Sequence, residues 1–207
     1  MINRMNMKKF PILSAIIVPI MLFAGCGRKD NSLPRDLISD TARFDSVFMD
    51  ISGWACHELH ALMVVKDGKV VDTSMGFTPL AGVLMGTRCG DIDPAIVPYI
   101  MNKKGYTADE MADYMNKQCG LLGISGVDSD LRFIEEAANG GNERAKLAMD
   151  MLVASIVKYI GSYAAAMNGV DAIVFTAGIG ENGPRLRRAV CEYLTFLGVE
   201  LDEEANN

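Results

Sequence analysis

The sequence has little positive charge and almost no histidine. Its 207 residues include 20 lysines and arginines against 26 aspartates and glutamates, which gives a formal net charge of −6, and only two histidines. A protein that binds nucleic acid needs a basic face to neutralise phosphates, so this balance argues against a nucleic-acid partner. Any anionic ligand would have to be held by local groups.

Cysteines are few and widely separated. None of the five has C-x-x-C spacing, and the histidines form no cluster of metal-ligand spacing with them; they are Cys26, Cys56, Cys89, Cys119 and Cys191. This pattern argues against a disulfide framework and against a zinc site. The sequence therefore predicts no metal-binding residues.

The apolar run near the N-terminus is too short to span a bilayer comfortably. It extends over residues 12–24 after Lys8 and Lys9, which is the length and charge pattern of a signal peptide. The run leads into Leu-Phe-Ala-Gly-Cys at 22–26, which resembles the lipobox of bacterial lipoproteins, where the cysteine is lipidated. Residues 1–26 are thus predicted to direct export and lipid anchoring at Cys26.

An alternative interpretation of this segment is a buried helix with a chance cysteine. Pro11 and Pro19 disfavour a regular helix there. Residues 27–50 are polar and are predicted to form a linker that ends in a strand at 47–49.

Half of the residues are apolar, which is enough for a core. The chain is organised around one stretch, residues 171–182, where a short apolar run leads into closely spaced glycines. Its β-branched and aromatic residues at 173–176 predict a buried parallel strand. Gly178 and Gly180 then predict a loop, and Pro184 suits the first position of a helix that Gly198 would end. Such a loop lets backbone N–H groups approach a phosphate or a nucleotide. A tight turn without a ligand explains the same glycines, so both interpretations stay open.

The remaining pattern predicts a mixture of strands and helices. Asp67-Gly68 between two apolar runs is typical of a β-hairpin. Helices are predicted over 93–104, over 107–120 with Thr107 and Glu110 as a capping box, and over 142–168, and a short strand over 199–201.

Two polar loops each carry an arginine. The first, 73–94, is dense in small residues and places Arg88 between glycines, where the backbone can come close to whatever the guanidinium binds. The second, 124–132, contains Asp130 and Arg132. The alternatives are a solvated arginine in a turn and ordinary helix-capping charges.

Four motifs occur in a fixed order between about residues 65 and 204. They are KDG at 66–68 with DTSMGFTP at 72–79, MGTR at 85–88 with GDIDP at 90–94, GISGV at 123–127 with DLR at 130–132, and FTAGIGEN at 175–182. Together they resemble the acetate kinase family of the acetate and sugar kinase/Hsp70/actin superfamily. The resemblance implies an α/β fold: an incomplete RNase H-like (actin-like ATPase) domain over residues 51–207, with a mixed sheet and flanking helices.

The resemblance also implies a reaction, in which the γ-phosphoryl group of ATP passes to acetate or another short-chain acid with Mg²⁺, giving acetyl phosphate and ADP. Arg88 matches the family's arginine that stabilises the transition state. Residues that match the segment beside the nucleotide are Asp130, Leu131 and Arg132. Those that match the nucleotide-binding loop are Gly178, Ile179, Gly180, Glu181 and Asn182. A homodimer and a cytoplasmic location are implied as well, so the leader and the body predict different compartments.

The sequence departs from the family at its N-terminal side. The family's His-Leu-Gly-Asn-Gly phosphate loop has no match before the hairpin, where this chain has Glu58 after His57 and a carboxylate would repel a triphosphate. The family's first half and its metal-binding glutamate have no counterpart, so its metal ligands are expected to be absent and turnover by this chain alone to be low. The alternative function is an inactive nucleotide-binding remnant, or a fusion behind a lipoprotein-type leader.

Overall fold

The computed structural model describes residues 5–7, 46–50, 62–66 and 69–206. The predicted hydrophobic run of the leader, its Cys26, most of the linker, and the departure at His57 and Glu58 lie outside these residues. The chain divides into two compact units, which are described separately. Unit 1 comprises residues 1–57, 62–73 and 157–207, and unit 2 comprises residues 58–61 and 74–156.

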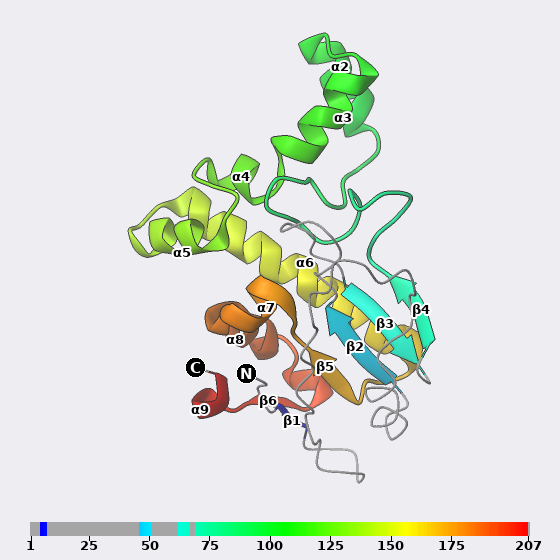
Figure 1. Cartoon of the computed structure of the whole chain (residues 1–207), viewed down its shortest axis with the longest axis vertical. Helices are drawn as coiled ribbons and strands as arrows, with labels where there is room; N and C mark the ends of the chain where they lie inside the picture. Colours follow the sequence, from blue (N-terminus) through cyan, green and yellow to red (C-terminus); the bar gives the residue numbers. More distant parts are fainter. Residues whose placement is uncertain (1–4, 8–45, 51–61, 67–68, 207) are drawn as a thin grey trace, which may run out of the picture. The chain divides into compact units, whose positions relative to one another are not determined.

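Unit 1 contains a mixed four-stranded sheet in the order β4-β3-β2-β5 (Figure 1). Its strands are β2 (Ser46–Asp50), β3 (Leu62–Lys66), β4 (Lys69–Thr73) and β5 (Ala172–Val174). Phe48 of β2 pairs antiparallel with Val64 of β3 and parallel with Ile173 of β5. β3 and β4 pair antiparallel with Lys66 opposite Lys69, so the predicted hairpin is confirmed. The predicted strands at 47–49 and 173–176 are confirmed too, the second as a parallel strand, although β5 ends at Val174 and its residues are half-buried rather than buried.

The segment after β5 differs from its prediction. The expected glycine loop is a short helix, α7 (Ala177–Asn182), and α8 (Pro184–Glu192) follows it at once. Glycine is a poor helix former, so the sequence favours a loop; in the structure the side chain of Arg187 donates to two carbonyls at the C-terminal end of α7.

The C-terminal part of unit 1 also differs in detail. The predicted helix does not run on to Gly198: α8 ends at Glu192, where the N–H groups of Tyr193 and Leu194 donate three residues back. A 3₁₀ turn, η1 (Thr195–Leu197), follows, with the N–H of Leu197 donating to Leu194 O. Gly198 then ends the turn with φ 79°. The predicted strand β6 (Val199–Leu201) is confirmed; it pairs antiparallel with β1 (Met5–Met7), and the acidic end forms α9 (Glu203–Asn206).

In unit 2 a long segment, 74–95, contains neither helix nor strand. The predicted loop over 73–94 is therefore confirmed, but the helix predicted over 93–104 begins only at Ile96, because Asp93 Oδ1 accepts from the Ala95 N–H in a turn that precedes it. Its helices are α2 (Ile96–Lys104), α3 (Ala108–Lys117), α4 (Gly120–Ser125) and α5 (Leu131–Asn139). The capping box of α3 is confirmed: Thr107 Oγ1 accepts from the Glu110 N–H, and Glu110 Oε2 accepts from the Thr107 N–H. The sequence predicts that this helix ends at Gly120, but α3 already ends at Lys117. Gly120 instead begins α4, because its φ of 59° turns the chain there.

The longest helix, α6 (Glu143–Met167), begins in unit 2 and ends in unit 1, which confirms the predicted helix over 142–168. Its buried residues recur at helical spacing: Ala145, Ala148, Leu152, Val153, Ile160, Tyr163, Ala164 and Met167. By length and apolar composition α6 could cross a membrane. Its one-sided burial is what a core helix of a globular domain shows.

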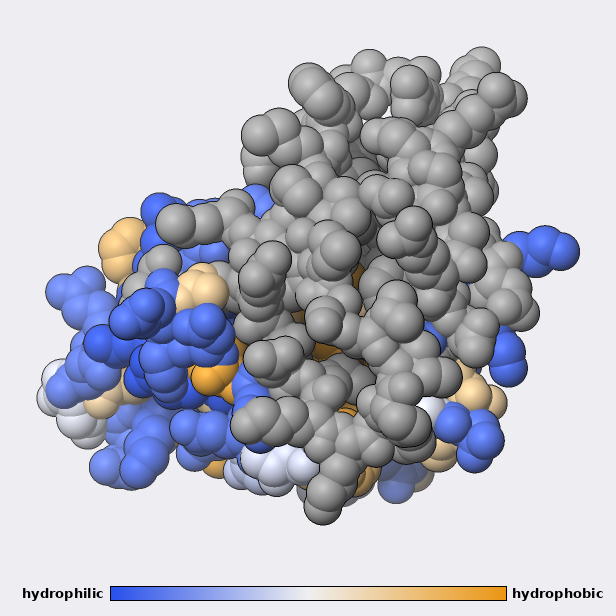
Figure 2. Space-filling model, turned by 90° about the horizontal axis from the view of Figure 1, so that it is seen from below, coloured by the Kyte–Doolittle hydropathy of each residue, from blue (hydrophilic) through white to orange (hydrophobic). Residues whose placement is uncertain are grey.

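Some large apolar side chains of the described residues are exposed. On the face shown in Figure 2, most of the coloured residues are hydrophilic. Exposed examples in the described part of the chain include Tyr99, Tyr193 and Phe196. Single exposed apolar residues are normal, so we assign them no role.

Candidate functional site

The segment around Arg88 in unit 2 is fixed by its backbone. Cys89 N–H donates to Met115 O at 3.0 Å and Cys119 N–H donates to Thr87 O at 2.9 Å, which ties the segment between the end of α3 and the start of α4. Gly120 packs on it so closely that a Cβ there would lie 2.1 Å from Met85 O and 2.8 Å from Arg88 O. The predicted loop therefore holds one backbone path, and Arg88 projects from a rigid base.

The Arg88 side chain is half-buried and has an unused donor. Its Nη1 is buried and has no hydrogen-bond partner among the described residues. A buried guanidinium N–H without an acceptor is costly, so this atom suits an anionic ligand. Burial raises the pKa of the neighbouring Cys89 thiol to about 11, so the thiol stays neutral at pH 7 beside the arginine.

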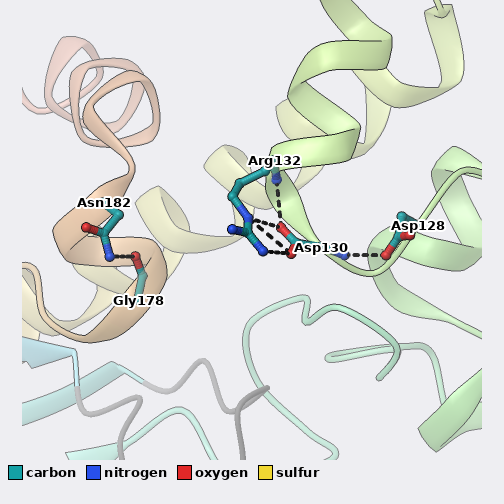
Figure 3. Close-up of polar contacts among 5 residues, drawn as sticks. All are labelled: Asp128, Asp130, Arg132, Gly178 and Asn182. Carbon is teal, nitrogen blue, oxygen red and sulfur yellow. Dashed lines mark hydrogen bonds and ion pairs between the residues drawn. The ribbon is translucent and has the colours of Figure 1, made fainter.

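Asp130 caps the helix that carries Arg132. Its Oδ1 accepts from the Arg132 N–H at 2.9 Å, and the Arg132 guanidinium folds back onto the same carboxylate, with Nη2 2.5 Å from Oδ2 (Figure 3). Hydrogen bonds from Arg132 lower the pKa of Asp130, and the pairing raises the pKa of Arg132. Both side chains are exposed enough for a ligand to reach them. Leu131 is 6% exposed, so its side chain belongs to the core of unit 2.

The structure brings the Arg88 segment and the Asp130 segment together. Gly86 packs against the residue before Asp130, since a Cβ on Gly86 would lie 3.0 Å from Ser129 O. The two polar loops predicted from the sequence are therefore neighbours within unit 2.

In unit 1 the matched nucleotide-loop residues form α7. Gly178 is exposed, and a Cβ built on it would meet nothing within 4 Å, whereas a Cβ on Gly180 would lie 3.2 Å from the backbone of Phe175. Asn182 Nδ2 donates to Gly178 O at 3.0 Å (Figure 3). Gly180 thus serves close packing, and Gly178 leaves an open face. Of the other two matched residues, Ile179 is half-buried and Glu181 is exposed.

Thr176 precedes α7 and has an unused hydroxyl. The residue is 3% exposed, and its Oγ1 has no hydrogen-bond partner in the part of the chain that the structure describes. Its extended backbone places it at the N-cap of α7, but its side chain does not cap the helix. The orphaned hydroxyl next to the open face of Gly178 fits a site for a polar ligand.

Two arginines that the sequence interpretation missed donate hydrogen bonds to backbone carbonyls of α7 and α4. Arg187 of α8 donates to Gly180 O and Glu181 O of α7, and Arg144 of α6 donates to Gly123 O and Ile124 O of α4. The spacing of Arg187 could have signalled its burial, because it lies three and four residues before the buried Val190 and Cys191.

The described residues do not form a metal site of their own. No group of three or more His, Cys, Asp or Glu side chains within them could hold a metal ion. In unit 2 the unpartnered guanidinium nitrogen of Arg88 fits an anionic ligand, and in unit 1 the unpartnered hydroxyl of Thr176 fits a polar one.

Solved structures show which class of fold this is. The chain is similar to the acetate kinase of Porphyromonas gingivalis, with a TM-score of 0.70 and 47% identity over 72% of this chain and 37% of that one. It is also similar to a propionate kinase of Francisella tularensis, with a TM-score of 0.68 and 42% identity over 72% of this chain and 38% of that one. The mixed sheet with flanking helices is therefore part of an actin-like ATPase fold.

The particular family follows from the sequence. The acetokinase family matches residues 55–207, and the chain belongs to this family. It is 59% identical over 146 residues to the acetate kinase of Heliobacterium modesticaldum, which covers 70% of this chain and 37% of that protein. The chain thus spans a little over a third of the length of the curated relatives that it matches.

Gly120 gives a test of how the Arg88 segment is held. We expect Gly120→Ala to lower the free energy of unfolding by well over 2 kcal/mol, because its positive φ and its clash with Met85 O add together. Gly105→Ala is the matched control, since Gly105 has a φ of 71° but open space around it, and should cost only about 1–2 kcal/mol. Urea unfolding followed by circular dichroism measures both. Equal losses would contradict the packing described here.

Proposed function

We propose that this chain carries the nucleotide-binding part of a kinase that transfers the γ-phosphoryl group of ATP to acetate or a similar short-chain acid. Membership of the acetokinase family supports the reaction class. The observation that carries the nucleotide assignment is Gly178, which leaves an open face at the position that matches the family's nucleotide loop. The similar structures include an acetate kinase and a propionate kinase, so the proposal names the acid only by class.

The proposed roles follow from the chemistry of each group. Around Gly178 and Gly180 the backbone, with Ile179, Glu181 and Asn182, would contact the nucleotide, because no side chain on Gly178 keeps it away. Asp130, Leu131 and Arg132 would lie beside the nucleotide as in the family. Arg132 is already paired with Asp130, which offsets its charge.

Arg88 would stabilise the transferring phosphoryl group. Phosphoryl transfer depends on positioning and on neutralising charge over the equatorial oxygens, and a planar guanidinium suits both needs. The buried, unpartnered Nη1 is a donor held ready for such an oxygen. Because the segment under Arg88 is fixed by backbone hydrogen bonds, little reorganisation is needed when the substrate binds.

Mg²⁺, a homodimer and a cytoplasmic location belong to the same proposal. Mg²⁺ bound with the nucleotide would neutralise phosphate charge, and this needs few protein ligands. A kinase that uses ATP works where ATP is abundant, which conflicts with the export predicted from residues 1–26. The domain boundary proposed at residue 51 would separate that leader and the linker from the kinase-like part.

Nucleotide binding is tested by Gly178→Ala. The methyl group would point into open space in the ligand-free protein, so stability should be unchanged or raised by about 0.5–1 kcal/mol, as for other helical glycines replaced by alanine. Affinity for ADP, measured by calorimetry, should fall at least tenfold because the methyl group blocks close approach.

Gly161→Ala is the control for that experiment. Gly161 is also helical and also lies in unit 1, and a Cβ added to it would likewise meet nothing within 4 Å, so its change should leave ADP affinity intact. If Gly178→Ala binds ADP as tightly as Gly161→Ala, the nucleotide does not lie on α7. Gly180→Val would be a poorer test, because it would also disturb Phe175.

Catalysis is tested in a chimera, because this chain spans only about 37% of its relatives. The matching segment replaces its counterpart in the Heliobacterium modesticaldum acetate kinase, and acetyl phosphate is trapped as the hydroxamate. We expect turnover that falls on the order of 10³-fold with Arg88→Ala, as for loss of a charge-stabilising arginine.

Arg185→Ala serves as the control in the chimera, since Arg185 is an exposed residue of α8 and should leave turnover unchanged. A folded chimera that binds ADP without turnover would instead favour the inactive nucleotide-binding alternative. Unchanged turnover in Arg88→Ala would remove Arg88 from the mechanism.

A further inference from the structure

Arg187 is a buried cation whose side chain ends among carbonyl oxygens. It is 7% exposed, and its Nη1 donates to Gly180 O at 2.7 Å and to Glu181 O at 2.6 Å. These are the fourth and fifth residues of the six in α7, so the guanidinium sits at the carbonyl end of that helix. A cation there satisfies carbonyls that have no partner within the helix and complements its dipole.

The other side of the same guanidinium binds the end of the chain. Nε donates to Asn206 Oδ1 at 3.0 Å, and Nη2 donates to Asn206 O at 2.6 Å. Asn206 is fully buried, and its Nδ2 donates to Pro184 O at 3.0 Å, in the first turn of α8. Arg187 therefore joins α7 to α9, and the fork geometry of a guanidinium is what lets one side chain reach both.

A helix as short as α7 needs such support. Helices below about 12–15 residues are marginal by themselves in water, and α7 contains two glycines, which are poor helix formers. Two other contacts help: Gly180 packs on Phe175, and Asn182 Nδ2 binds Gly178 O. Arg187 adds a contact from another helix: its buried guanidinium donates hydrogen bonds to two backbone carbonyls of α7.

We propose that Arg187 is a positioning residue for nucleotide binding, which holds α7 in the conformation that presents Gly178 and its neighbours to the nucleotide. This inference rests on the proposed function. Arg187 contacts α7 at the carbonyls of Gly180 and Glu181. The open side of Gly178 does not face Arg187, because a Cβ built on Gly178 would meet no atom within 4 Å. A binding surface that is ordered before the ligand arrives costs less conformational entropy on binding.

The test compares Arg187→Met with Arg188→Met in the full chain. The two residues are neighbours in α8, and both contact α9, since Arg188 pairs with Glu203; of the two, Arg187 is the one that donates hydrogen bonds to the carbonyls of α7. In the ligand-free protein, hydrogen exchange read by mass spectrometry should become at least tenfold faster in peptides covering 177–183 for Arg187→Met alone. Affinity for ADP should fall at least tenfold for Arg187→Met and less than twofold for Arg188→Met.

Arg187→Lys measures what the fork contributes. A lysine ammonium keeps the charge but cannot span two helices with planar donors, so exchange and affinity should lie between wild type and Arg187→Met. If Arg187→Met does not fold, Asn206→Ala carries the test: it removes one acceptor on the α9 side and should speed exchange in 177–183 by a smaller factor.

The outcomes separate the two claims. Two results for Arg187→Met overturn the positioning role: exchange in 177–183 as slow as in Arg188→Met, or exchange that rises equally throughout α6 and α8. The second result would leave only a general effect on stability. A wild-type chain that binds no ADP overturns the nucleotide assignment, while the exchange measurement still decides whether Arg187 orders α7.

Discussion

The structure depends on arginine side chains that bind the carbonyl ends of very short helices. α4 and α7 each have six residues, and in each the fourth and fifth carbonyls accept from a guanidinium: Gly123 O and Ile124 O from Arg144, and Gly180 O and Glu181 O from Arg187. Neither helix is long enough to be stable by itself. Each arginine comes from a later helix, so the local conformation is fixed by tertiary structure.

This arrangement has a functional consequence within each unit. α4 leads into the loop that ends at Asp130, where Ser125 and Asp128 side chains accept backbone N–H groups and keep the loop in one conformation. α7 carries the residues that match the family's nucleotide loop. Both candidate ligand-binding segments therefore follow or form a helix whose carbonyl end is bound by an arginine of a later helix.

The sequence predicted those parts of the fold whose cause is local. The capping box at Thr107 and Glu110 and the hairpin at Asp67-Gly68 are specified by residues a few positions apart, and α6 by a regular apolar stripe. The glycines of α7 predict a loop, and the hydrogen bonds to the carbonyl end of α7 come from Arg187, which lies outside the motif and is invisible in it. Gly120 was misread as a helix end for a similar reason: its contact with Met85 O is invisible in the sequence around it.

The motifs predict which residues belong to the candidate site. Their burial and their hydrogen-bond partners, which only the structure shows, separate their roles. The sequence alone does not distinguish four arginines that have different hydrogen-bond partners in the structure: Arg88, Arg132, Arg144 and Arg187. Arg144 and Arg187 donate to backbone carbonyls, and Arg132 is paired with the carboxylate of Asp130. Arg88 keeps a buried Nη1 without an acceptor among the described residues, beside a thiol that burial keeps neutral.

A chain with a net charge of −6 does not attract a triphosphate through its overall field, so local charge must do so. The charge of Arg132 is already offset by Asp130, and a phosphate would have to compete with that carboxylate. At Arg88 no such competition exists for Nη1 among the described residues, and the backbone beneath it is already fixed by hydrogen bonds to α3 and α4. Within unit 2 the cost of recruiting a guanidinium to a phosphoryl oxygen is therefore lowest at Arg88, which is why the proposed catalytic role belongs there and the supporting role to Arg132.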